Sequence, residues 1–231
     1  ERTSGLDIGL PVAMDVCYMY WMNRIIALFG DRSSLNTAMA LRAFSESNRT
    51  GFNVRVRYCE DFDLVSCVGT GRLATIQLTP LGHDFRAALN PLIARGAEIP
   101  LSLQQKAIIL QALLNGRLTK CKANIFHFLR YVHLTSGQLV PRERVRVPHE
   151  YVTVWNTHLG TSYNSHTLTK LLHFTCNQCV ELDLVERIET PRQQPTYSVV
   201  LTSLGSRLLG YFELFLHLKR EEISIPMAVE A

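Results

Sequence analysis

Apolar side chains recur at helical spacing in several stretches of the chain, with polar and charged residues between them. This periodicity of 3.6 residues predicts amphipathic helices. The first stretch ends at Gly30, the second begins with a serine cap at Ser34, and the third ends at Asn115 and Gly116, which are common residues at helix boundaries. The pattern predicts helices over 14–29, 34–46, 102–114, 119–134 and 165–180.

Two other stretches predict β-hairpins of nearly the same design. Each begins with Asp-Leu-Val, passes through a polar turn and returns along a run of β-favouring residues. One turn reads Gly-Thr-Gly-Arg and the other Pro-Arg-Gln-Gln-Pro. The Asp-Leu-Val starts lie at 63–65 and 183–185, and the turns lie at 69–72 and 191–195.

Both predicted hairpins end in the same junction with a following helix. The chain reads Leu-Thr-Pro-Leu-Gly at 78–82 and Leu-Thr-Ser-Leu-Gly at 201–205. Thr79 and Thr202 lie at the N-cap position, where a hydroxyl accepts a hydrogen bond from a backbone N–H of the first helical turn. Pro80 then occupies the first helical position, where its missing N–H costs nothing. A whole supersecondary unit is therefore repeated in the chain.

This repeated unit of helices, a hairpin and one more helix resembles the C-terminal part of winged-helix regulators of the MarR and PadR kind. The resemblance covers residues 52–90 and 160–215. It implies a mainly α fold with small β-hairpins (α+β), made of two tandem winged-helix domains over 1–95 and 96–231. An extra segment around 139–161, in the second domain, matches neither copy.

Composition narrows the class of protein. Of the 231 residues, 47% are hydrophobic and 19% are charged, which is typical of a globular chain. The longest apolar runs contain polar or charged residues, so no membrane helix is expected. Six cysteines are too few for a disulfide scaffold, and reduced core cysteines predict an intracellular protein. The chain begins at Glu1 rather than at a methionine, which mildly favours a fragment of a longer protein.

The net charge of +4 is compatible with nucleic acid and does not require it. In a winged helix, the helix before the hairpin enters the major groove and the hairpin tip contacts the backbone. The alternative interpretation of the polar residues on this helix is that they form an ordinary solvent-exposed face. The DNA-contacting residues that the resemblance implies for the second copy are Asn164, His166, Thr167, Lys170 and His173 on the helix, with Arg192, Gln193 and Gln194 at the hairpin tip.

The first copy is less clear. Its recognition segment would be 51–61, with Arg55 and Arg57, but the alternation Val-Arg-Val-Arg there is more typical of a strand. Arg72 lies in the hairpin turn. The acidic residues Glu60, Asp61 and Asp63 are close by and would repel phosphate if they faced it.

A separate basic stripe lies between two prolines. If the stretch is extended, its period of two residues brings three arginines to one face. The equally good alternative is a solvated connection. The stripe consists of Arg142, Arg144 and Arg146.

The sequence contains little that predicts catalysis or metal binding. His173, Cys176 and Cys179 are spaced by three residues, but structural zinc needs four ligands and no second Cys-x-x-Cys is present. Positions i, i+3 and i+6 also drift around a helix axis. No phosphate loop, nucleophile elbow or zinc-protease motif occurs. We expect no enzyme activity, metal or cofactor within this chain.

Sequence-specific binding of double-stranded DNA through two winged-helix modules is therefore the leading hypothesis. It covers a transcription regulator, a replication initiator and the target-recognition part of a modular type IIS restriction endonuclease whose nuclease domain lies outside this chain. The alternative is a tandem winged-helix protein-interaction module of a chromosome-organising complex. Exposed apolar residues in the last helix, such as Phe212 and Leu214, would suit a partner protein.

Overall fold

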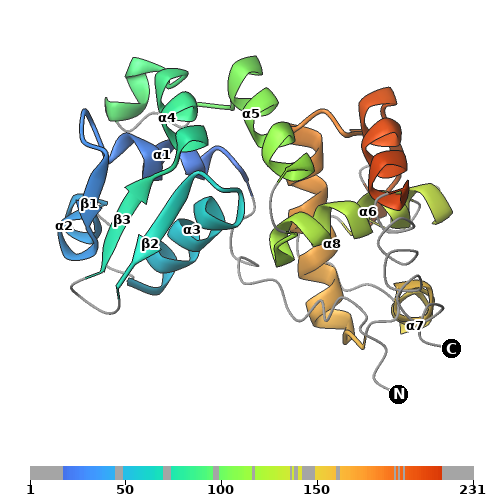
Figure 1. Ribbon diagram of the computed structural model, residues 1–231. Helices are drawn as coiled ribbons and strands as arrows, with labels where there is room; N and C mark the ends of the chain where they lie inside the picture. The colour runs from blue at the N-terminus through green and yellow to red at the C-terminus, as the bar shows by residue number, and fades with distance from the viewer. Residues whose placement is uncertain are drawn as a thin grey trace, which may run out of the picture.

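The computed structural model is mostly helical with small antiparallel sheets, as predicted for an α+β chain. Figure 1 shows the three-stranded sheet and its helices at the left, a group of helices that includes α6, α7 and α8 at the right, and α5 at the top between these two groups. The described residues are 18–44, 49–69, 74–95, 99–115, 118–135, 137, 140–141, 149–159, 162–189, 191, 193–194 and 196–214.

The first half of the chain forms a three-stranded sheet with four helices. Its strands are antiparallel and their order is β1-β3-β2, so the first strand pairs with the third and the third with the second. The elements are α1 (Trp21–Ala27), β1 (Ser34–Asn36), α2 (Thr37–Ala43), α3 (Arg49–Asp61), β2 (Val65–Val68), β3 (Thr75–Leu78) and α4 (Pro80–Ala87).

The second half repeats this order of elements. Strand β4 pairs with β6 and β5 pairs with β7, and only Ser198 separates β6 from β7. The strands therefore pair as β1, β3 and β2 do in the first half. The elements are α6 (Lys120–Thr135), β4 (Val140–Pro141), α7 (His149–Leu159), α8 (Ser165–Glu181), β5 (Val185–Arg187), β6 (Thr196–Tyr197), β7 (Val199–Leu201) and the helical residues 203–214.

The two hairpin-to-helix junctions have matching contacts. Thr79 donates its hydroxyl hydrogen to the carbonyl of Asp63 and accepts from the backbone N–H of Gly82 at 3.0 Å. In the second copy, Thr202 donates to the carbonyl of Asp183 at 2.7 Å and accepts from Gly205 at 3.0 Å. The threonine thus joins the strand start to the helix start.

The glycine of each junction is required by a close backbone approach. A Cβ on Gly82 would lie 1.9 Å from the carbonyl oxygen of Leu64, and one on Gly205 would lie 2.0 Å from that of Leu184. Any side chain would therefore separate the helix from the strand. The Thr-x-x-Gly spacing in the sequence reflects this tight packing.

Several predicted elements are confirmed. Helix α5 (Leu103–Leu114) has the predicted cap at Ser102, which forms a reciprocal capping box with Gln105. Helices α6 and α8 lie where the periodicity placed them, and Thr79 caps α4 with Pro80 in its first turn. A short 3₁₀ helix, η2 (Pro91–Arg95), lies at the end of the predicted first domain.

The strand-like interpretation of residues 54–57 is wrong, because they lie inside helix α3. Phe52, Val56 and Cys59 are buried at helical spacing, and they pack this face of the helix into the core. Tertiary packing overrides the β preference of the two valines.

The predicted serine cap at Ser34 is also wrong. Ser34 pairs with Gln77 in the sheet, and α2 begins three residues later. The cap is Asn36, whose side chain accepts a hydrogen bond from the backbone N–H of Ala38 at 2.9 Å. Asparagine is among the best N-cap residues, so the sequence contained this signal.

The segment around 139–161 takes the same place as β1 and α2 in the first half. It contains β4, which pairs with β6, and α7, which contacts α8. Strand β4 has only two residues, which is too few for an alternating pattern to be recognised in the sequence. Its second residue, Pro141, has no N–H to donate to the sheet.

The buried side chains of both halves form one continuous cluster. It runs from α1 and α3 through α5 and α6 to α8 and the helical residues 203–214. The described cysteines are free, and Cys59, Cys121, Cys176 and Cys179 belong to this core as expected, whereas Cys67 is exposed on β2.

Candidate nucleic-acid interface

The start of α8 carries the candidate contacts of the second copy. Asn164 is the N-cap, and its side-chain oxygen accepts from the backbone N–H of Thr167 at 2.9 Å. His166 is exposed, and Thr167 and Lys170 are half-buried. His166, Lys170 and the half-buried His173 lie at i, i+4 and i+7, so they share one face of the helix.

Exposure decreases along this face of α8. Asn177 and Gln178 are buried, and the helix runs through the middle of the second half between α6, α7 and the strands. The accessible part is therefore confined to the first two turns. Those turns offer an amide, a hydroxyl, imidazoles and one lysine, which are groups that can read base edges or phosphates.

The hairpin after α8 adds polar residues at its tip. Gln193 and Gln194 are both exposed, and the Gln194 N–H donates to the carbonyl of Pro191 at 3.0 Å in a tight turn. The sequence reasoning missed Arg187 on β5. Its guanidinium lies 5.1 Å from the centroid of the Tyr197 ring and donates to the side-chain oxygen of Asn177.

The two candidate arginines of α3 lie on opposite sides of the helix, because residues two apart are about 200° apart around the axis. Arg57 is exposed. Arg55 is half-buried, and its guanidinium lies 4.1 Å from the Trp21 ring centroid and 5.3 Å from that of Phe44. The structure therefore does not bring Arg55 and Arg57 to one surface.

Arg24 joins Arg55 at the same rings. Its guanidinium lies 4.7 Å from the centroid of Trp21 and 5.2 Å from that of Phe44. Arg24 is not among the DNA-contacting residues expected from the sequence. The signal that could have identified it is the i, i+3 spacing of Trp21 and Arg24 on one helix face.

The acidic residues at the end of α3 and just after it make contacts within the protein. Glu60 accepts from the backbone N–H of Cys67 at 3.2 Å, and Asp63 pairs with Lys122 at 2.5 Å. Burial raises the pKa of Asp61, partly offset by a hydrogen bond to Cys121. The repulsion of phosphate that the sequence suggested is thereby reduced for Glu60 and Asp63.

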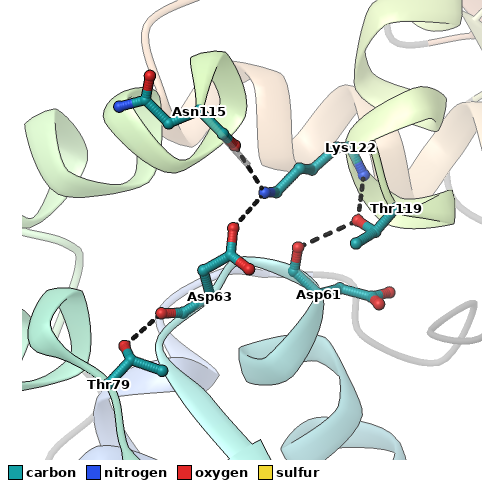
Figure 2. A network of polar contacts seen from close by, with 6 residues as sticks. All are labelled: Asp61, Asp63, Thr79, Asn115, Thr119 and Lys122. Carbon is teal, nitrogen blue, oxygen red and sulfur yellow. Dashed lines mark hydrogen bonds and ion pairs between the residues drawn. The ribbon is translucent and has the colours of Figure 1, made fainter. Parts of the chain in front are cut away.

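Figure 2 shows where this acidic segment meets the second half of the chain. The Lys122 ammonium lies between the Asp63 carboxylate and the carbonyl of Asn115, at 2.5 and 3.2 Å. Thr119 donates to the carbonyl of Asp61 at 3.0 Å. The candidate recognition helix α3 therefore ends on the start of α6.

Five candidate residues lie outside the described residues. They are Arg72 in the first hairpin turn, Arg192 in the second, and the basic stripe Arg142, Arg144 and Arg146.

The His173, Cys176 and Cys179 series does not form a common site. Cys176 and Cys179 are buried in the core, where burial raises the pKa of both thiols, and Tyr197 donates its hydroxyl hydrogen to the Cys176 sulfur at 3.5 Å. Metal binding by cysteine requires the thiolate, which this burial disfavours. Among the described residues, no three His, Cys, Asp or Glu side chains are grouped to hold a metal ion.

Comparison with protein-family models, with curated proteins and with solved structures finds no match to this chain. No described helix is both long and apolar enough to cross a membrane.

Proposed function

We propose that the chain binds double-stranded DNA through two winged-helix modules. The order helix, strand, helix, helix, hairpin and helix occurs twice, with the first strand pairing to the third in each half. In this proposal α3 and α8 are the recognition helices, and the β2–β3 and β5–β7 hairpins carry the wings.

One observation carries the proposal. The first two turns of α8 offer accessible polar side chains, and the hairpin that follows this helix exposes Gln193 and Gln194 at its tip. His166 and Lys170 on the helix would contact base edges or phosphates, and the hairpin tip would contact the backbone. In the first module, Arg57 would take the equivalent role, because it is exposed on α3.

A salt titration tests this proposal. Affinity for a random-sequence duplex and for duplexes selected from a random pool is measured between low and physiological salt. We expect a steep loss of affinity with salt and a large ratio of selected to random binding. The absence of duplex binding at low salt would refute the proposal.

Variants locate the contact surface. Lys170→Ala and Arg192→Ala should each weaken specific binding, by about 1–3 kcal/mol where a base contact is lost. Arg207→Ala is the matched control, because Arg207 is an exposed basic residue on the last helix. Unchanged affinity in both test variants would move the interface to Arg57 or to the stripe of Arg142, Arg144 and Arg146.

A protein-interaction module is the second candidate, and one observation favours it. Tyr211 and Leu214 are 63% and 54% exposed on the helical residues 203–214, at a spacing that puts both on one face. Unchanged DNA affinity together with loss of a partner complex in Tyr211→Ser would assign this face to protein binding.

A further inference from the structure

Asp63 and Asp183 occupy equivalent positions that do not favour aspartate locally. Both have a left-handed backbone, with φ of 57° and 58°, directly after α3 and α8. Glycine or asparagine suits this conformation at a helix end better. A carboxylate there also faces the negative end of the helix dipole. The repeated choice of aspartate therefore needs a reason beyond the turn.

In both copies that reason is a lysine from the segment between the two hairpins. Lys122 on α6 reaches Asp63 at 2.5 Å, and Lys106 on α5 reaches Asp183 at 2.6 Å. Lys122 is completely buried, and its ammonium also donates to the carbonyl of Asn115 at 3.2 Å. Figure 2 shows Asp63 held on the other side by Thr79, so the ion pair connects α6 directly to the hairpin junction.

Of the two ion pairs, Asp63–Lys122 joins residues 1–95 to 96–231, whereas Lys106–Asp183 lies within 96–231 and holds α5 against the second hairpin junction. Further polar contacts connect α5 and α8 to the first half. Gln105 on α5 donates to the side-chain oxygen of Asn23 at 2.7 Å, and Asn23 donates to the carbonyl of Ile99 at 3.0 Å. Glu181, at the end of α8, accepts from the backbone N–H of Met19 at 2.7 Å. We define the joint as Asn23, Asp63, Gln105, Lys106, Lys122, Glu181 and Asp183 with their hydrogen-bond partners.

The energetics of such contacts decide what they contribute. The Lys122 side chain is 1% exposed, whereas the Asp63 side chain is 40% exposed. A charge taken out of water loses solvation that its partner only partly restores, so a pair with one buried member stabilises little relative to an apolar pair of similar size. It does penalise every arrangement that leaves one charge unpaired. The two copies already share a continuous apolar core, which tolerates sliding more readily than a hydrogen-bonded joint does.

We propose that Asp63 and Asp183 are positioning residues that hold the two modules in one fixed orientation, so that the chain reads DNA as a single rigid unit. Asp63 does so directly through Lys122, and Asp183 does so through Lys106, which fixes the helix α5 that Gln105 joins to Asn23. This rests on the proposed function of the two modules. The consequence is one permitted spacing between the two DNA subsites, because a rigid body cannot adjust the distance between its two reading helices.

The test replaces the Asp63–Lys122 ion pair by an uncharged pair of similar size, Asp63→Asn with Lys122→Met, and adds Asp183→Asn. Asparagine keeps a residue that tolerates the left-handed backbone. Asp84→Asn is the matched control, because Asp84 is exposed on α4. Each protein is used to select binding sites from a random duplex pool, and its thermal midpoint is measured in parallel.

We expect the wild type and Asp84→Asn to select two subsites at one spacing. The triple variant should stay folded with a similar thermal midpoint and select subsites at several spacings, with at least a tenfold smaller preference for the original spacing. An unchanged single spacing in the folded triple variant would overturn the proposal. If the triple variant unfolds, the same selection is carried out with Asp183→Asn alone. This single variant should stay folded, because the Asp183 side chain is 60% exposed.

A second measurement separates failure of this proposal from failure of DNA binding. Spin labels are attached through noncanonical amino acids at two exposed positions, Asp84 on α4 and Ser206 in the last helix. Pulsed electron resonance then gives the distance distribution between the halves without DNA. One narrow distance in the wild type that broadens in the triple variant supports the joint even if no duplex binds. Equal widths in both would overturn the joint.

Discussion

His127 lies on α6 with both ring nitrogens buried and without a hydrogen-bond partner among the described residues. Its ring meets Phe212 edge-on at a centroid distance of 6.3 Å. Burial, reinforced by the nearby Arg130, lowers the pKa of His127 to about 4. An unfolded histidine has a pKa near 6.5, so the unfolded chain binds this proton first.

His127 should therefore make the fold acid-sensitive. The stability that the neutral ring contributes is present above about pH 6.5 and is lost as the pH falls towards 4. His127→Leu removes this titration. The loss of unfolding free energy between pH 7.5 and pH 4.5 should therefore be smaller in this variant than in the wild type, by roughly 2–3 kcal/mol. Urea unfolding at the two pH values measures it. His133→Leu, an exposed histidine on the same helix, is the control; equal pH dependence in both variants would contradict the prediction.

Protonation of Glu181 changes the stability of the fold in the opposite direction to protonation of His127. Burial raises the pKa of its carboxyl, and the hydrogen bond from the Met19 N–H opposes this shift. The folded state therefore holds this proton more tightly than the unfolded state, and its protonation adds stability as the pH falls towards the unfolded pKa near 4.5.

Glu181→Gln should be neutral or stabilising at pH 7, because glutamine keeps an acceptor for the Met19 N–H and removes the cost of a buried charge. The stability of this variant should then fall more steeply with acid than that of the wild type. The reason is that the stabilising protonation of Glu181 no longer offsets the destabilising protonation of His127. Urea unfolding from pH 7 to pH 5 tests both statements, with the exposed Glu186→Gln as control. A loss above about 1 kcal/mol at pH 7 would show that the charge itself is needed.

At the scale of elements, the hairpin-to-helix junction is the most sharply defined part of each copy. Gly82 and Gly205 allow the backbone of one element to touch that of another. Gly210, in the same stretch of the chain as Gly205, has no atom within 4 Å of where its Cβ would be. Gly82 and Gly205 therefore serve as test positions, and Gly210 serves as their control.

Gly82→Ala and Gly205→Ala should each destabilise the protein by about 1–3 kcal/mol, because the added methyl meets a carbonyl oxygen that belongs to a strand start. Gly210→Ala should be neutral or stabilising by up to about 1 kcal/mol, as alanine is the better helix former. Chemical denaturation measures all three. Equal stability of Gly82→Ala and Gly210→Ala would mean that α4 can shift away from Leu64 without loss.

These junctions explain which elements the sequence could predict. A threonine, a glycine and a turn lie within a few residues of one another, so the hairpins and their following helices follow from local chemistry. Helix α3 could not be predicted in this way, since Val54 and Val56 favour a strand until their surroundings are known. The two-residue strand β4 forms only because β6 lies beside it.

The candidate site was predictable to a similar extent. The order of the elements located the start of α8 and the hairpin tip, where His166, Gln193 and Gln194 are indeed exposed. Burial of the second half of α8 depends on α6 and α7, and the pairing of Arg55 with Trp21 depends on α1. Such contacts between distant segments leave no local pattern in the sequence.

At the scale of the whole molecule, the joint makes one cooperative unit from two copies. Separation of the halves would break the Asp63–Lys122 ion pair and the hydrogen bond between the side chains of Gln105 and Asn23. The apolar core also continues across the joint. Opening between the halves would therefore also expose apolar surface of both.

We accordingly expect a single calorimetric transition with a ratio of van't Hoff to calorimetric enthalpy near one, because the shared core and the joint couple the unfolding of the two halves. Residues 1–95 and 96–231, produced separately, should each lack a cooperative melting transition, since the cut removes α5 and Lys122 from Asp63 and Met19 from Glu181. The intact chain measured under the same conditions is the reference. Two separate transitions in it, each matching one of the isolated halves, would show that the joint couples the copies only weakly.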